Sequence, residues 1–72
     1  MNWGRWYLDE NALDLKYDVT SNHTYEIPLE TCRSEKRRAE WVEHIAEKSW
    51  ATGEDIINLR EALEWLLERR LL

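Results

Sequence analysis

The sequence contains few of the residues on which several protein architectures depend. Its 72 residues include one cysteine, one proline, two glycines and no phenylalanine. A single cysteine, Cys32, cannot form a disulfide within the chain, so a disulfide-stapled secreted scaffold is excluded and a reducing compartment is favoured. With Gly4 and Gly53 as the only glycines, a glycine-rich phosphate-binding loop is excluded as well.

Long apolar runs are also missing. No stretch approaches the roughly 20 apolar residues that a membrane-spanning helix needs. The amino-terminal segment MNWGRWYLDE turns acidic almost at once, which is unlike a signal peptide. We therefore expect a cytoplasmic protein that does not enter a membrane.

Groups suited to catalysis or metal binding are scarce. Cys32, His23 and His44 are the only cysteine and histidines, and no short paired spacing joins them as in a zinc site. Cys32 lies in no known nucleophile motif, and a small buried apolar role between strand and helix suits it better. We predict a protein that is not an enzyme and that has no catalytic residue, cofactor or metal.

Tryptophan and tyrosine, in contrast, are abundant. The chain has five tryptophans and three tyrosines, while its length allows only one small core. Large aromatic side chains dominate the energetics of small cores. We expect them to stabilise a single small domain over residues 1–72.

Acidic side chains outnumber basic ones, and they do so unevenly. The formal charge is −5, and residues 1–30 contain six acidic side chains against two basic ones. Such a chain is poorly suited to nonspecific nucleic-acid binding and is attracted to basic surfaces. Four acidic residues of this segment are therefore predicted to contact a partner: Asp9, Glu10, Asp14 and Asp18.

The first 17 residues show the pattern of a β-hairpin. Residues 6–8 (WYL) and 12–17 (ALDLKY) are separated by an Asp-Glu-Asn segment, whose composition is typical of a tight turn. Alternation along the second run would place Leu13, Leu15 and Tyr17 on one buried face.

A third strand is predicted after a polar stretch at residues 18–24. Residues 25–29 (YEIPL) again alternate apolar and polar side chains. Pro28 has no amide donor, so this strand should lie at a sheet edge or end near that residue. Two or three short antiparallel strands are thus expected over residues 5–29.

The remaining residues have helical periodicity. Ser34 is a suitable N-cap for a helix over residues 34–49, and Thr52 begins a capping box for a second helix over residues 52–70. The apolar stripes at helical spacing are Trp41, Val42, Ile45, Ala46 and Ser49 in the first helix, and Ile56, Leu59, Ala62, Leu63, Leu66 and Leu67 in the second.

Trp50 lies in the short corner predicted between the two helices. We expect its ring to fill the space between the helix ends, as part of a core formed by Trp41, Ile45, Trp50, Leu59, Leu63 and Leu66. The fold class that follows is α+β, with a short antiparallel sheet packed against a C-terminal pair of helices. Trp65 falls on the other side of the second helix, roughly opposite Ile56. It either covers neighbouring side chains or, as we predict, contacts another protein.

Three segments carry a further pattern: residues 25–32 (YEIPLETC), 41–52 (WVEHIAEKSWAT) and 59–63 (LREAL). This pattern resembles a family of small uncharacterised proteins of bacteria and their phages, with a Leu-Glu-Arg-Cys strand end, an Asp-Trp-Ile helix, a Lys-Thr-Trp-Ala-Thr corner and a closing Ala-Leu helix. The chain departs from it at Thr31, where the family tends to have arginine, and at Trp65, where it tends to have a polar residue. The resemblance implies a bacterial or phage origin and no particular activity.

The function predicted from these features is binding to another protein. An acidic and aromatic surface would dock on a basic surface of a partner, as in a phage or prophage accessory protein that inhibits or modulates a host protein, including one of nucleic-acid-directed defence. Two alternatives are a homo-oligomer that uses the Trp65 face and a nucleic-acid mimic. Direct DNA contact through Lys36, Arg37 and Arg38 is disfavoured, because three charges without a basic remainder are typical of a solvated face.

Overall fold

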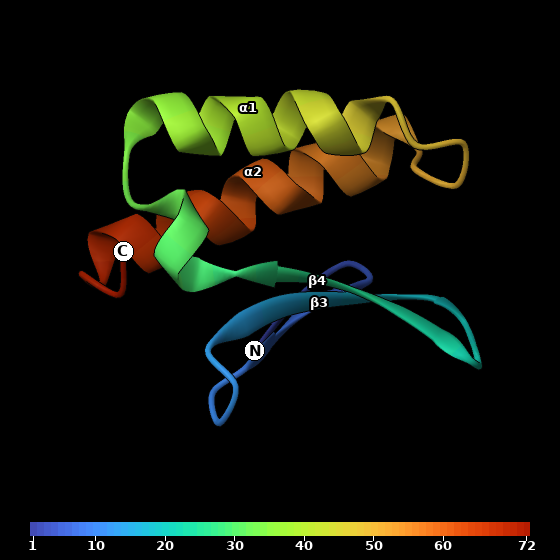
Figure 1. The fold of residues 1–72 in the computed structure, drawn as a ribbon, viewed down its shortest axis with the longest axis horizontal. Coiled ribbons are helices and arrows are strands. Elements are labelled where there is room, and N and C mark those ends of the chain that lie inside the picture. Colours follow the sequence, from blue (N-terminus) through green and yellow to red (C-terminus); the bar gives the residue numbers. More distant parts are fainter.

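The computed structural model describes residues 1–72 and shows an α+β fold in which two helices cover one face of an antiparallel sheet (Figure 1). The predicted fold class is confirmed, but the sheet has four strands, in the order β1-β2-β3-β4. The elements are β1 (Asn2–Trp3), β2 (Trp6–Asp9), β3 (Asp14–Thr20), β4 (His23–Pro28), a 3-10 helix η1 (Leu29–Cys32), α1 (Glu35–Ala46) and α2 (Gly53–Glu68).

The prediction of two or three strands missed β1. This strand has only two residues, too few to show an alternating pattern. It pairs with β2 through a tight turn in which Gly4 has a φ of +60°. That backbone conformation suits glycine, and a Cβ at this position would also collide with the Asn58 side chain of α2. Gly4 thus lets the first strand lie directly against α2.

The strand boundaries also differ from the prediction. β3 continues to Thr20 and β4 begins at His23, so most of the polar stretch 18–24 is strand. Every residue of the stretch 18–24 except the half-buried Val19 is exposed, so the stretch is polar on both faces and lacks the alternation of a half-buried strand. Leu13, predicted to share the buried face of β3, instead lies in the turn with a φ of 57° and is 61% exposed. β4 is an edge strand that ends at Pro28, as predicted.

Both helices begin at the predicted caps. The Ser34 side chain accepts a hydrogen bond from the Arg37 amide, and Thr52 and Asp55 form a reciprocal capping box. α1 ends at Ala46, three residues earlier than expected, because its last turn tightens through the bonds from Glu47 N–H to His44 O and from Lys48 N–H to Ile45 O. The corner is consequently six residues long, 47–52.

The core lies between the sheet and the helical pair. Its fully buried members come from both layers and include Trp6, Leu15, Tyr17, Ile27, Ile45, Leu59, Ala62 and Leu66. Leu63 is buried as well, whereas Trp41 and Trp50 are half-buried and pack against this core. Trp50 packs in tilted orientation against Tyr17, at a ring-centroid distance of 4.7 Å, and against Tyr25, at 5.5 Å, so it joins the helical corner to the sheet.

The apolar stripes predicted for the helices are wider than the surface the sheet covers. Ala46, Ser49 and Leu67 are exposed, and Val42 and Ile56 are only half-buried. Each helix packs on the sheet and on its neighbour along a narrow strip, so the margins of both stripes stay at the surface.

Candidate protein-binding surface

The face of the sheet that the helices leave open is acidic. Trp6, Leu15, Tyr17 and Ile27 are buried beneath the helices, so the alternating residues of each strand point to the opposite side. This side, termed the acidic face below, is formed by Asn2, Tyr7, Asp9, Asp14, Lys16, Asp18, Thr24, Glu26 and Pro28. It carries four carboxylates and one ammonium group.

A hydrogen-bond network around Asp18 orders one end of the acidic face. The carboxylate oxygen Oδ1 of Asp18 accepts from Tyr7 Oη at 2.9 Å and from Thr24 Oγ1 at 2.9 Å. The three residues come from three adjacent strands, β2, β3 and β4. The bond to Asp18 raises the pKa of Tyr7, so its hydroxyl stays protonated and donates.

The other end contains the ion pair between Lys16 and Asp9, with a distance of 2.7 Å from Nζ to Oδ2. The hydrogen bond from Lys16 lowers the pKa of Asp9, with a further contribution from the Ala12 amide, and the same bond raises the pKa of Lys16. Asp14 lies directly opposite Asp9 in the β2–β3 register. Lys16 therefore neutralises one carboxylate, and the rest of the face stays negative.

The structure brings together three of the acidic residues predicted to contact a partner. Asp9, Asp14 and Asp18 share the acidic face, whereas Glu10 is exposed in the following turn. The sequence prediction missed Glu26 and Tyr7 as members of this surface. Glu26 lies between the half-buried Tyr25 and the buried Ile27, and this alternation was present in the sequence. Its position beside Lys16, however, depends on the register of β3 and β4.

Trp65 lies on the helical side of the molecule, away from the acidic face. Its ring packs edge-on against Trp3 with centroids 5.4 Å apart, and the Arg69 guanidinium lies 4.6 Å from its centroid. Periodicity along α2 could not reveal this contact, because Trp3 belongs to the two-residue strand β1. Trp65 is half-buried and holds β1 on α2.

Asp55 is the one buried charged residue, with 3% of its surface exposed. Its carboxylate accepts from Tyr17 Oη at 2.8 Å and from the Thr52 amide at 2.9 Å. Burial opposes its ionised form, but the bonds from Thr52 and Tyr17 outweigh burial and hold the pKa of Asp55 below its usual value. Burial and the bond to Asp55 raise the pKa of Tyr17. These hydrogen-bond partners belong to β3 and to the N-cap of α2, so Asp55 links the two elements.

The remaining reactive side chains are dispersed. Cys32 is fully buried in η1, and burial raises the pKa of its thiol, which disfavours the nucleophilic thiolate. His23 and His44 are exposed on different elements, and no three His, Cys, Asp or Glu side chains are grouped to hold a metal ion. The three side chains are therefore not gathered in one place.

The basic cluster at the start of α1 is partly used by the fold. Lys36 and Arg37 are exposed, while Arg38 is half-buried and its Nη1 donates to the backbone oxygen of Cys32 at 3.0 Å. Arg38 therefore helps to join η1 to α1.

Comparison of the chain with protein-family models, with curated proteins and with solved structures finds no match. The resemblance to small bacterial and phage proteins accordingly stays a prediction. No helix of the structure combines the length and the hydropathy needed to cross a membrane.

Proposed function

We propose that this protein is a binding module that docks its acidic face on a basic surface of another protein and thereby inhibits or modulates that protein. One observation supports this most directly: Asp9, Asp14, Asp18 and Glu26 gather on one open sheet face with Lys16 as its only cation. A concentrated negative field speeds encounter with a basic partner and selects against acidic ones.

Tyr7 gives the same face an aromatic contact group. It lies on the central strand pair, opposite Lys16, and its hydroxyl is fixed by Asp18. A tyrosine ordered in this way loses little side-chain entropy when a partner packs on it. The acidic face thus combines electrostatic steering with a preorganised aromatic group.

Protein binding suits this surface better than nucleic-acid mimicry does. A mimic needs carboxylates in rows that replace phosphates, whereas here Lys16 lies between the acidic residues and pairs with Asp9. Mixed charges with one central cation fit a protein surface that offers carboxylates as well as basic groups. Following the resemblance, we propose a bacterial host protein as the partner.

The proposal is tested by affinity capture from bacterial lysate at physiological salt, with the double variant Asp14→Asn/Glu26→Gln beside the wild type. Neither side chain makes a hydrogen bond within the chain, so the fold should be kept. We expect a protein that the wild type retains, that raised salt elutes, and whose affinity for the variant is reduced about tenfold.

The matched control is Glu61→Gln/Glu68→Gln, which removes the same charge from exposed positions of α2. This control should retain the partner as the wild type does. Equal loss in both variants would show that net charge, and not the acidic face, is responsible. Binding of duplex DNA by the wild type at physiological salt would contradict the proposal.

A further inference from the structure

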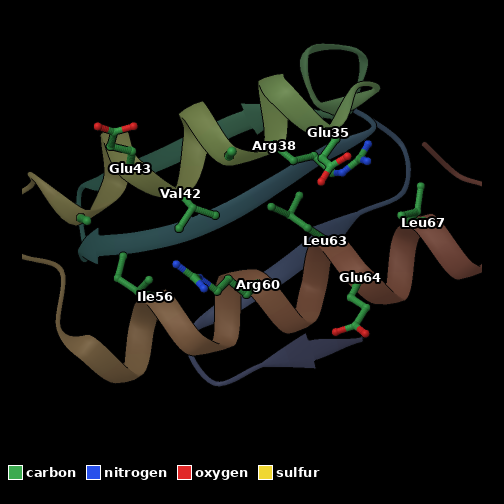
Figure 2. Close-up of a pocket in the computed structure, with 11 residues that line it drawn as sticks. Glu35, Arg38, Val42, Glu43, Ile56, Arg60, Leu63, Glu64 and Leu67 are labelled. Carbon is green, nitrogen blue, oxygen red and sulfur yellow. The ribbon is translucent and has the colours of Figure 1, made fainter.

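A groove runs between α1 and α2 on the side of the helical layer that faces away from the sheet (Figure 2). It has a volume of about 750 Å³ and is lined by residues of both helices. Its apolar lining consists of Ala39, Val42, Ala46, Ile56, Leu63 and Leu67. These include the margins of the two apolar stripes that the sheet leaves uncovered.

Charged residues stand at both ends of this groove. Figure 2 shows Glu43 of α1 toward one end, with the Arg60 side chain of α2 reaching along the groove in that direction, and Arg38 of α1 at the other end with Glu64 of α2. Glu35 also lines this second end and lies beside Arg38 in the view. The only ion pair in the chain is that of Lys16 and Asp9, so none of the opposite charges across the groove is paired within one molecule.

Except for Glu35, which comes near Glu64 of the second copy as a like charge, this charge pattern is self-complementary under a two-fold rotation about an axis along the groove. Such a rotation places α1 of one copy against α2 of the other. Glu43 then faces Arg60 of the second copy, and Arg38 faces Glu64. Each contact occurs twice, and every facing helix pair is antiparallel, because α1 and α2 run in opposite directions.

We propose that a second copy of this chain occupies the groove and forms a symmetric dimer with a four-helix interface. Facing grooves become the centre of a four-helix bundle, whose core the apolar lining of both copies fills. The small side chains of Ala39 and Ala46 allow the helices of the two copies to approach closely. Leu67, 44% exposed in one chain, becomes covered.

This interface is separate from the proposed partner-binding surface. The groove lies on the outer side of the helical layer, with the sheet behind the helices in Figure 2, and the acidic face is the side of the sheet that points away from the helices. The dimer therefore presents two acidic faces, one at each end. Dimerisation does not depend on whether the acidic face binds another protein.

Sedimentation equilibrium over a micromolar to millimolar concentration series tests the dimer. We expect the wild type to approach twice the mass of one 8.8 kDa chain. Glu43→Arg and Arg60→Glu, both at exposed positions, each place like charges opposite each other in the homodimer and should raise the dissociation constant at least tenfold. An equimolar mixture of the two variants should recover the wild-type affinity, because each heterodimer regains opposite charges at both contacts.

Glu40→Arg is the matched control, since it changes the same charge on α1 outside the groove; it should dimerise like the wild type. Leu67→Lys should reduce dimerisation without any change at the charged pairs. Circular dichroism checks that every variant is folded. A wild type that stays monomeric throughout, or a mixture of Glu43→Arg and Arg60→Glu that dimerises no better than either alone, would overturn the proposal. Binding of an unrelated amphipathic helix by a monomeric wild type would overturn it too.

Discussion

At the scale of single residues, Asp55 is the side chain on which both layers converge. Its carboxylate completes the capping box of α2 and accepts from Tyr17 of β3, while its backbone oxygen accepts from the Trp6 indole at 3.0 Å. The sequence predicted only the first of these roles, because a capping box is visible within four residues. The bonds to Trp6 and Tyr17 span 49 and 38 residues, respectively.

Replacement of Asp55 by alanine should lower the free energy of unfolding by about 2–4 kcal/mol, because it removes a cap and leaves the buried hydroxyl of Tyr17 without its acceptor. Urea denaturation measures this change. Glu54→Ala in the same helical turn is the control: Glu54 is exposed and makes no side-chain hydrogen bond, so its loss should cost about 0.5 kcal/mol. Similar costs for the two variants would show that Asp55 acts only through the helix dipole.

The low pKa of Asp55 also predicts how stability depends on pH. A carboxyl group whose pKa is lower in the folded chain stabilises it above the unfolded pKa of about 3.9 and loses that contribution as the pH falls through the folded value. The stability difference between the wild type and Asp55→Asn should therefore be constant near neutral pH and shrink below about pH 4. Urea titrations of both proteins at several pH values measure it. A difference that grows on acidification would contradict the assignment.

At the scale of elements, α2 ends in a motif that has arginine at the position where glycine is usual. The Leu71 amide donates to Leu66 O at 2.9 Å and the Arg70 amide to Leu67 O at 3.1 Å, the two bonds of a Schellman motif. Arg70, at the position where glycine is usual, has a φ of 59°. The left-handed conformation costs a residue with a Cβ about 1–2 kcal/mol.

Arg70→Gly should therefore stabilise the protein by about 1 kcal/mol. Arg70→Ala separates the backbone effect from loss of the guanidinium group, since alanine keeps the Cβ and should bring no comparable gain. Thermal or urea unfolding of the three proteins distinguishes them. If alanine stabilises as much as glycine, the arginine side chain and not the backbone is the source of strain.

The sequence predicted the starts of elements better than their ends. Ser34 and Thr52 are evident because each cap acts on amides within its own first turn. The end of α1 at Ala46 and the extension of β3 to Thr20 have no equivalent signal, since a tightened helical turn and a water-facing hairpin depend on what packs beside them. The strand β1 was not predicted for a similar reason: Trp3 is part of a strand only because β2 and Trp65 lie next to it.

At the scale of the whole molecule, charge is distributed by layer. The sheet exposes carboxylates on its open face, while the helices carry both signs at their groove. On the acidic face, Asp14 lies directly opposite Asp9, and like charges in facing positions of a sheet destabilise it. This arrangement costs stability and, on the proposed function, supplies the field that attracts a partner.

Neutralising Asp14 should separate these two effects. We expect Asp14→Asn to raise the free energy of unfolding by about 0.2–1 kcal/mol, with the gain smaller at high salt because the repulsion is screened. The same variant should bind the captured partner more weakly. A variant that is both less stable and unchanged in binding would show that Asp14 has a structural role and is no part of the binding surface.

By itself, the sequence determined the α+β class, the two helix caps, the edge position of Pro28 and the negative sign of the first 30 residues. These follow from local chemistry. A cap acts within one helical turn, proline has no backbone N–H to donate, and the sign of a segment follows from the number of its acidic and basic residues. Only the tertiary structure decided that Asp9, Asp14, Asp18 and Glu26 share a face, that Trp65 packs on Trp3, and that Leu67 and Ala46 line an outer groove. Each of these three features depends on strand register or on packing between distant segments. The periodicity of a single helix or strand does not specify which other element covers that helix or strand.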